Sequence, residues 1–223
     1  MNKFIPIFLV VLGVLVTLGA PNSSGEESKS YQLFETVAEK LQKSVWSEEI
    51  LGKFEEYLNV VKEWSESDEN LQTSTVYEKF REELKKCSEE LQDLKAQPNN
   101  CAKQLALKET HEEIRHLFDS VDDEKLRRDW VKKYMNFAVP MRSISRNSNE
   151  QFYAFLKETV ENYLNGVDTT AQSEDLVEWH KKFAKQTDYV KQQKMVMEFM
   201  ALFPEERKMY EANKCQVQYS TGL

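Results

Sequence analysis

The chain has 223 residues, and its 30 Lys and Arg against 38 Asp and Glu give a formal net charge of −8 at pH 7. A net negative chain has no electrostatic attraction for the phosphates of nucleic acids or for anionic membrane surfaces, so neither is expected as a partner. The basic clusters KLRRDWVKK and HKKFAK lie beside acidic residues in helical patterns, which is typical of solvated helix faces.

Residues 1–19 are predicted to be a secretory signal peptide. Lys3 precedes an uncharged apolar run over residues 4–18, and Thr17 and Gly19 supply small side chains for cleavage after Gly19. The run is shorter than the ~20 residues of a membrane-spanning helix, and few basic residues flank it, which favours cleavage over a retained anchor. No other apolar run approaches this length. We therefore expect a secreted, extracellular protein without stable membrane insertion after cleavage.

Residues 20–30 form a polar stretch that is rich in serine, and they are expected to be a flexible lead-in. Asn22 begins an Asn-Ser-Ser sequence, which is the acceptor pattern for N-glycosylation after export. Removing the signal peptide takes away Lys3 and no acidic residue, so the net charge of −8 becomes −9 in the mature chain. A single helical domain is expected over residues 31–215, with residues 216–223 as a tail.

The mature chain keeps three cysteines, Cys87, Cys101 and Cys215. Thiols tend to pair in an oxidising compartment, and an odd number leaves one over. The sequence allows any of the three pairings, and it also allows a disulfide-linked dimer through Cys215. No Cys-x-x-Cys pair is present, so neither a redox dithiol nor a zinc ribbon is supported.

Apolar residues recur at spacings of three and four along most of the chain. This periodicity predicts an all-α protein, an antiparallel bundle of about seven or eight amphipathic helices with no sheet. Ser47, which is followed by two glutamates, predicts the start of one helix. The most regular stripe includes Cys87 and therefore places this side chain against a partner helix. The stripe consists of Tyr77, Phe80, Leu84, Cys87, Leu91 and Leu94.

The few prolines and glycines mark where the helices are expected to begin and end. Pro140 is expected to kink or end its helix, Gly166 to close another, and Pro204 to begin the last one. Residues 142–150 form the longest polar stretch after the lead-in, so a subdomain break, if there is one, is expected there. Leu105 is assigned to the apolar face of its helix.

Three histidines limit the catalytic and metal-binding chemistry of the chain. In HEEIRH, His111 and His116 are five residues apart, whereas the zinc-binding pair on one helix face is four apart, so we interpret both as surface residues. The chain has no Gly-x-Ser-x-Gly nucleophile elbow and no glycine-rich phosphate loop. A cysteine nucleophile is disfavoured by export to an oxidising space. We predict no catalytic site, no metal and no cofactor.

Residues 195–203, MVMEFMALF, are almost entirely apolar and include three methionines. A helix that is apolar nearly all round is normally enclosed by other helices, so the first interpretation is a core helix in which Met197 packs against neighbours. Methionine also suits surfaces that accept apolar ligands of varied shape, so the second interpretation is the wall of a ligand pocket. The candidate lining residues are Met195, Met197, Phe199, Met200, Phe203, Trp179 and Phe183.

Two main hypotheses of function follow. The leading one is a secreted, non-catalytic helical binding protein that carries a lipid or other apolar ligand between its helices, stabilised by ~25 cal/mol per Å² of hydrocarbon removed from water. The alternative is an extracellular protein whose helix faces bind another protein or a second copy of itself, with no cavity. A helical enzyme of unknown class comes third.

Overall fold

The computed structural model describes residues 28–168 and 173–217. All regular structure in these two ranges is helical, with no strand, which confirms the all-α fold. The predicted signal peptide, the acceptor Asn22, most of the expected lead-in and residues 218–223 lie outside the described residues. Those assignments and the boundaries of the single domain stay predictions.

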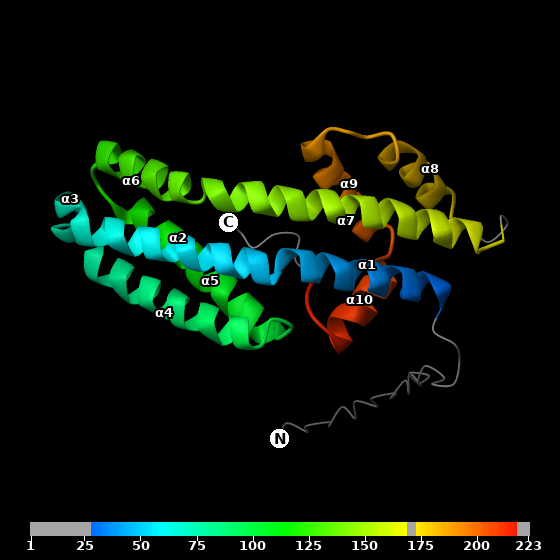
Figure 1. Ribbon diagram of the computed structural model, residues 1–223, viewed down its shortest axis with the longest axis horizontal. Helices are drawn as coiled ribbons and strands as arrows, with labels where there is room; N and C mark the ends of the chain where they lie inside the picture. Colours follow the sequence, from blue (N-terminus) through cyan, green and yellow to red (C-terminus); the bar gives the residue numbers. More distant parts are fainter. Residues whose placement is uncertain (1–27, 169–172, 218–223) are drawn as a thin grey trace, which may run out of the picture.

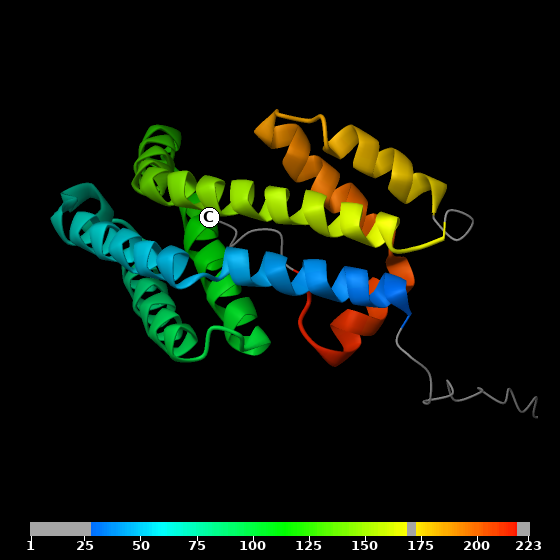
Figure 2. The ribbon, with the colours of Figure 1, turned by 45° about the vertical axis from the view of Figure 1, so that its right-hand side comes forward.

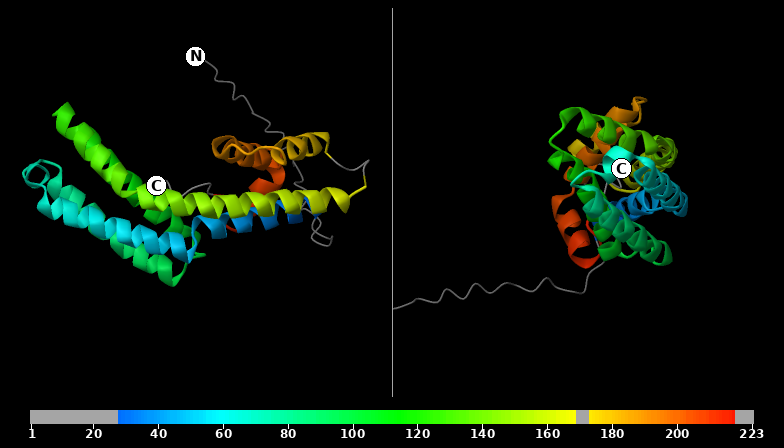
Figure 3. Two further views of the ribbon diagram at one scale, coloured as in Figure 1. Left: turned by 45° about the horizontal axis from the view of Figure 1, so that its top comes forward. Right: turned by 90° about the vertical axis from the view of Figure 1, so that its left-hand side faces the viewer.

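Two pairs of helices, each laid end to end, form the long axis of the molecule (Figures 1 and 3). α1 (Lys29–Val45) continues into α2 (Glu48–Ser67), and α6 (Glu124–Phe137) continues into α7 (Val139–Asn165). α7 runs along α1 in the opposite direction and also contacts α2. This long helix therefore joins the two ends of the molecule.

A hairpin of two helices packs against α2, at the α2 end of the molecule. α4 (Tyr77–Ala96) contacts α2, and α5 (Cys101–Leu117) returns along α4. A single helical turn, α3 (Glu69–Gln72), precedes the hairpin, and a 3-10 turn, η1 (Phe118–Ser120), follows it. This end of the molecule is built around the predicted apolar stripe of α4.

Three shorter helices pack at the other end (Figure 2). α8 (Glu174–Phe183) lies on α7, and α9 (Tyr189–Ala201) lies on α8. α10 (Pro204–Asn213) contacts both α9 and α1. The chain then returns toward the α4–α5 turn, where it is held by a disulfide bond.

The helix ends lie where the capping residues of the sequence place them. Ser47 caps α2, because its Oγ accepts a hydrogen bond from the Ile50 N–H at 3.3 Å. The N–H of Gly166 donates to the Asn162 carbonyl at 3.0 Å and ends α7. Pro204 occupies the first position of α10, where its missing N–H costs no helical hydrogen bond. All three predicted ends are confirmed.

The apolar stripe of α4 faces the neighbouring helices as its spacing predicts. Tyr77 at its start is partly buried, and the other five side chains are at most 3% exposed. Burying a large apolar side chain stabilises a fold by roughly 1.5–3 kcal/mol, so this stripe holds the α4–α5 hairpin to α2. The five are Phe80, Leu84, Cys87, Leu91 and Leu94.

The polar residues of 142–150, where any subdomain break was expected, do not interrupt the helix. They lie inside α7, which begins just before Pro140 and runs on to its glycine cap. The stretch has no residue that forbids a helix, and the Ser148 Oγ donates to the Ser44 carbonyl of α1 at 2.9 Å. The Asn149 Nδ2 donates to the Tyr189 Oη of α9 at 2.7 Å, so the polar side chains face solvent or contact α1 or α9. The break that Pro140 predicts is found instead between α6 and α7.

Candidate functional site

Four aromatic side chains that were candidates for an apolar site pack ring against ring between α8, α9 and the start of α10. The ring centroids of Trp179 and Phe183 are 4.7 Å apart, and Phe199 lies 5.0 Å from Trp179 and 5.0 Å from Phe203. None of the four is more than 6% exposed. We call these four rings, together with the fully buried Met200, the C-terminal aromatic cluster.

The other two candidate methionines lie at the edge of this cluster or outside it. Met195 is half-buried, and its carbonyl accepts a hydrogen bond from the Trp179 Nε1–H at 2.8 Å. Met197 is 50% exposed, so the expectation that it packs against neighbours is wrong. It is one residue beyond the buried Val196, and each residue turns the helix by about 100°, which carries its side chain off the buried face.

The C-terminal aromatic cluster merges with the core of the α1 end. Phe203 lies 6.1 Å from Phe34 of α1, and Phe34 lies 5.8 Å from Tyr210 of α10, measured between ring centroids. Close packing of this kind is ordinary for a protein interior. The side chains therefore occupy the space between α1, α8, α9 and α10, as the core-helix interpretation predicts.

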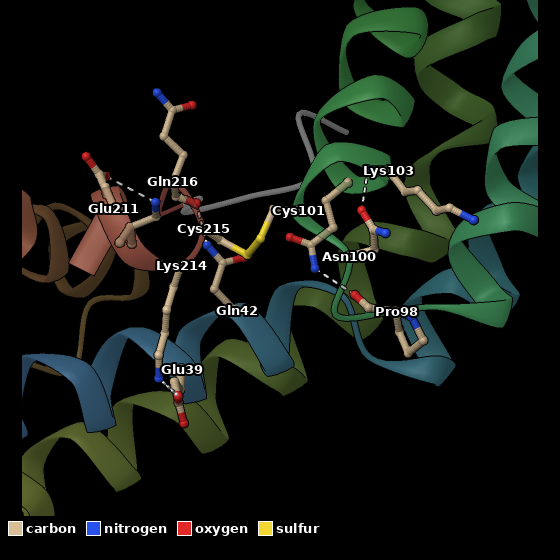
Figure 4. The surroundings of a disulfide bond; sticks show 12 residues. Glu39, Gln42, Pro98, Asn100, Cys101, Lys103, Glu211, Lys214, Cys215 and Gln216 are labelled. Atoms are coloured by element: carbon tan, nitrogen blue, oxygen red, sulfur yellow. Dashed lines mark hydrogen bonds and ion pairs between the residues drawn. A yellow bond between two sulfur atoms is a disulfide. The ribbon is translucent and has the colours of Figure 1, made fainter. Parts of the chain in front are cut away.

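Cys101 and Cys215 form a disulfide bond, with their Cα atoms 5.3 Å apart (Figure 4). Cys101 is the first residue of α5, and Cys215 follows α10. Cys87 is the unpaired cysteine of the described chain, and it is fully buried. Burial, followed by the nearby carboxylates of Glu90 and Glu83, raises the pKa of the Cys87 thiol well above its usual range. Neither Cys87 nor Cys215 is therefore free to link two folded chains.

An open groove runs beside this disulfide, and we call it the disulfide groove. It consists of two hollows of about 430 and 240 Å³, which adjoin because Lys43 and Asn99 line both. Ligand sites usually occupy about 300–1,000 Å³, so the groove is large enough to hold a ligand. Its walls come from the α1–α2 junction, the α4–α5 junction and α10 with the segment after it. The side chains used below are Gln42, Lys43, Trp46, Asn99, Gln104 and Tyr210.

Most charges at the groove are already paired. The Lys214 Nζ lies 2.7 Å from Glu35 Oε1 and 2.6 Å from Glu39 Oε1, and these hydrogen bonds raise the pKa of Lys214 above its usual range. The Lys95 Nζ lies 2.5 Å from Glu55 Oε2, and this contact is the main cause of the lowered pKa of Glu55. Lys43, between the two hollows, has no hydrogen bond or ion pair with any described residue.

Three buried polar atoms of groove residues have no hydrogen-bond partner among the described residues. They are the Oε1 atoms of Gln42 and Gln104 and the Nε1–H of Trp46. The residues are 8%, 3% and 4% exposed, respectively. A buried donor or acceptor without a partner costs about 1–3 kcal/mol, and such atoms call for a specific explanation. The three atoms are themselves shielded from solvent beneath the groove surface, so a ligand in the groove can pair with them only after these side chains rotate.

Gln104 occupies a buried position that the sequence pattern assigned to its neighbour. The Gln104 Nε2 donates to the Pro98 carbonyl at 2.6 Å, while Leu105 is 38% exposed, so the assignment of Leu105 to the buried face is wrong. On α1, the Gln42 Nε2 donates to the Gln216 carbonyl at 2.7 Å (Figure 4). These two amides hold the α4–α5 turn and the segment after α10 in place, which forms the groove.

His111 is also buried, at 5% exposed, so its interpretation as a surface residue is wrong. It lies on the inner face of α5 among Phe54, Tyr57 and Tyr134, with ring centroids 5.3–5.9 Å away. His116 is exposed and lies 3.1 Å from Asp119. In the part of the chain that the structure describes, no three His, Cys, Asp or Glu residues are grouped closely enough to hold a metal ion.

No protein-family model, curated protein or solved structure matches this chain. None of the helices that the structure describes is both long enough and apolar enough to cross a membrane. Apart from Cys101 and Cys215, the groove residues were not singled out from the sequence, because they belong to three segments that only the fold brings together. A glutamine on the apolar face of a helix, as at Gln42 and Gln104, was the one available signal.

Proposed function

We propose that this protein is an extracellular, non-catalytic binding protein whose disulfide groove takes up an extended peptide segment of another protein. The observation that carries the proposal is the group of three unpartnered polar atoms in buried side chains of the groove, Gln42, Trp46 and Gln104. A structure that leaves donors and acceptors unpaired beside an open hollow is suited to a ligand that supplies the missing partners.

A peptide is the ligand class that fits these atoms best. Its backbone presents N–H donors to the two amide oxygens and carbonyl acceptors to the indole N–H, along a single extended chain. A hydrocarbon chain satisfies none of the three.

The disulfide supports an extracellular location for this binding. Structural disulfides persist in oxidising compartments and are rare where glutathione keeps thiols reduced. The Cys101–Cys215 bond is part of the groove wall, and it fixes the segment after α10 against the start of α5. An oxidising environment would therefore preserve the shape of the binding surface.

The apolar-ligand hypothesis requires a different site. Five of its seven candidate residues belong to the C-terminal aromatic cluster, whose rings lie 4.7–5.0 Å from their neighbours. A lipid chain would have to displace these side chains and lose their packing. Saturable uptake of a fluorescent fatty acid, abolished by Phe199→Ala, would favour that hypothesis over the groove.

The test of the proposal is selection of peptides from a phage-displayed library of random dodecamers, with affinities measured by fluorescence anisotropy. The groove variant is Gln42→Met/Trp46→Phe/Gln104→Met, which keeps side-chain volume and removes the unpaired groups together with the Nε2 donors of the two glutamines. Because the Gln216 and Pro98 carbonyls then lose a donor, the variant should be somewhat less stable, and circular dichroism and thermal unfolding check that it is folded before its expected loss of peptide binding is measured. The control is Gln151→Met, an exposed amide on α7. A failure to enrich any peptide, or equal binding to the groove variant, would refute the proposal.

A further inference from the structure

We infer that the peptide bound in the disulfide groove carries an acidic side chain, Asp or Glu, that pairs with Lys43. This inference rests on the proposed function and specifies the chemistry of the partner. Lys43 is in the last turn of α1 and lines both hollows, so this residue lies where the two parts of the groove meet. A ligand that spans the groove has to pass it.

Lys43 is the groove lysine whose charge the described part of the chain leaves unmatched. Lys214 is held by Glu35 and Glu39, and Lys95 by Glu55. Lys43 forms no hydrogen bond or ion pair with any described residue. The C-terminal end of α1 stabilises its positive charge but supplies no ion partner.

The acidic residues of the groove do not compete for Lys43. Glu39 is committed to Lys214. Glu48 is in the first turn of α2, beside the cap Ser47, where the helix N-terminus stabilises a negative charge. Charge complementarity at the centre of the groove therefore favours a negative group on the ligand, and it rejects a lysine or arginine at that position.

The size of the expected effect is modest, because Lys43 is exposed in the free protein. Exposed ion pairs contribute little, and a pair that the ligand partly covers contributes somewhat more. We expect Lys43→Gln to weaken a selected peptide by about fivefold, and Lys43→Glu to weaken it further by like-charge repulsion. The effect should shrink at high salt, since partly exposed charges are screened.

The experiment is a charge-swap cycle with the selected dodecamers. Four proteins are compared: wild type, Lys43→Gln, Lys43→Glu and the control Lys62→Gln, which changes an exposed lysine of α2 outside the groove. Each protein is titrated with a selected peptide and with versions of that peptide in which one acidic residue at a time is changed to Lys. The inference expects one acidic position at which the Lys version binds Lys43→Glu better than it binds wild type. Lys62→Gln should behave as wild type.

The outcomes separate the two proposals. If peptides bind wild type but not the groove variant, and neither Lys43 substitution changes their affinity, the inference about the acidic residue is wrong and the peptide-binding function stands. If selected peptides have no acidic residue in common, the inference is also wrong. If no peptide is enriched, the proposed function fails and the inference fails with it.

Discussion

Tyr57 of α2 and His111 of α5 meet in the interior of the α2 end, where the Tyr57 Oη and the His111 Nε2 lie 3.4 Å apart. The rings of Phe54 and Tyr134 enclose the imidazole on other sides. Burial, and to a smaller extent the positive charge of Arg115, lowers the pKa of His111 to about 4. The fold therefore requires the neutral form of this histidine.

The first prediction is that His111 makes the fold sensitive to mild acid. An imidazole that titrates near pH 6.5 when unfolded and near 4 when folded loses stabilisation as the pH falls from 6.5 to 4. The loss between pH 7.5 and pH 5 should be roughly 2 kcal/mol of the free energy of unfolding. His111→Phe should remove this dependence, as measured by urea unfolding at both pH values. The exposed His116→Gln serves as the control, and equal pH dependence in all three proteins would contradict the prediction.

The second prediction concerns thiol reactivity. Cys87 is fully buried with a raised pKa, and the other two cysteines are bonded to each other, so iodoacetamide should modify no cysteine of the native protein. Unfolding without reductant should expose Cys87 alone, and reduction should then expose Cys101 and Cys215. Mass spectrometry of the intact protein counts the added groups. Modification of the native protein at Cys87 would mean that α4 opens from its neighbours.

The third prediction is that the disulfide contributes about 2–5 kcal/mol to the free energy of unfolding. Cys101 and Cys215 are separated by 114 positions, so the bond restricts a large part of the unfolded chain. Guanidinium chloride unfolding of the double variant Cys101→Ser/Cys215→Ser should show a lower midpoint and a larger m-value, because the unfolded chain without the bond is more expanded. An unchanged midpoint would show that the unfolded chain is constrained by other means.

The fourth prediction concerns Asp68, which caps α3 and joins it to α2 and α6. Its Oδ1 accepts from the Leu71 N–H, and its Oδ2 accepts from the Trp64 Nε1–H at 3.0 Å and from the Lys133 Nζ at 2.7 Å. Burial alone raises the pKa of Asp68, but these hydrogen bonds outweigh it and leave the pKa lowered. The stabilisation is therefore present above the unfolded pKa and is lost as the pH falls through the folded pKa.

Asp68→Ala removes all three of these hydrogen bonds and should destabilise the fold by about 2 kcal/mol. Asp68→Asn keeps an oxygen for the cap and should cost about half as much. Thermal unfolding at neutral pH measures both. Equal effects of the two substitutions would show that the charge matters more than the cap.

The fifth prediction separates a core position from an exposed one on the same helix. Phe199→Ala should destabilise the protein by about 3–5 kcal/mol, because it removes a fully buried ring from the C-terminal aromatic cluster. Met197→Ala should change the free energy of unfolding by less than about 0.5 kcal/mol, because Met197 is half exposed. Urea unfolding compares the two variants. A large effect of Met197→Ala would show that its side chain is packed in solution.

Helix type and helix ends were predictable because they depend on neighbouring residues. Ser47, Gly166 and Pro204 act through hydrogen bonds within one or two turns, and the stripe of α4 repeats over several turns. The polar stretch at residues 142–150 was expected to hold any subdomain break, but it lies within α7 because polarity alone does not break a helix. The contact that holds it, from Ser148 to Ser44, is with a residue about a hundred positions away.

The groove and the buried histidine were not predictable in the same way. Which face of α5 is buried depends on where α2 and α6 lie, so Leu105 and His111 exchange their expected exposures. The choice among three cysteine pairings depends on where the segment after α10 returns. In a helix that is apolar nearly all round, such as α9, the pattern cannot show that Met197 is the residue left exposed.

The bond between Cys101 and Cys215 closes residues 101–215 into a covalent ring that includes every helix from α5 to α10. A protease that hydrolyses one peptide bond within this ring leaves both fragments attached to each other. A nicked molecule would keep its full mass on a non-reducing gel and separate into two pieces only after thiol treatment. Such a molecule stays together as an assembly after its backbone has been cut.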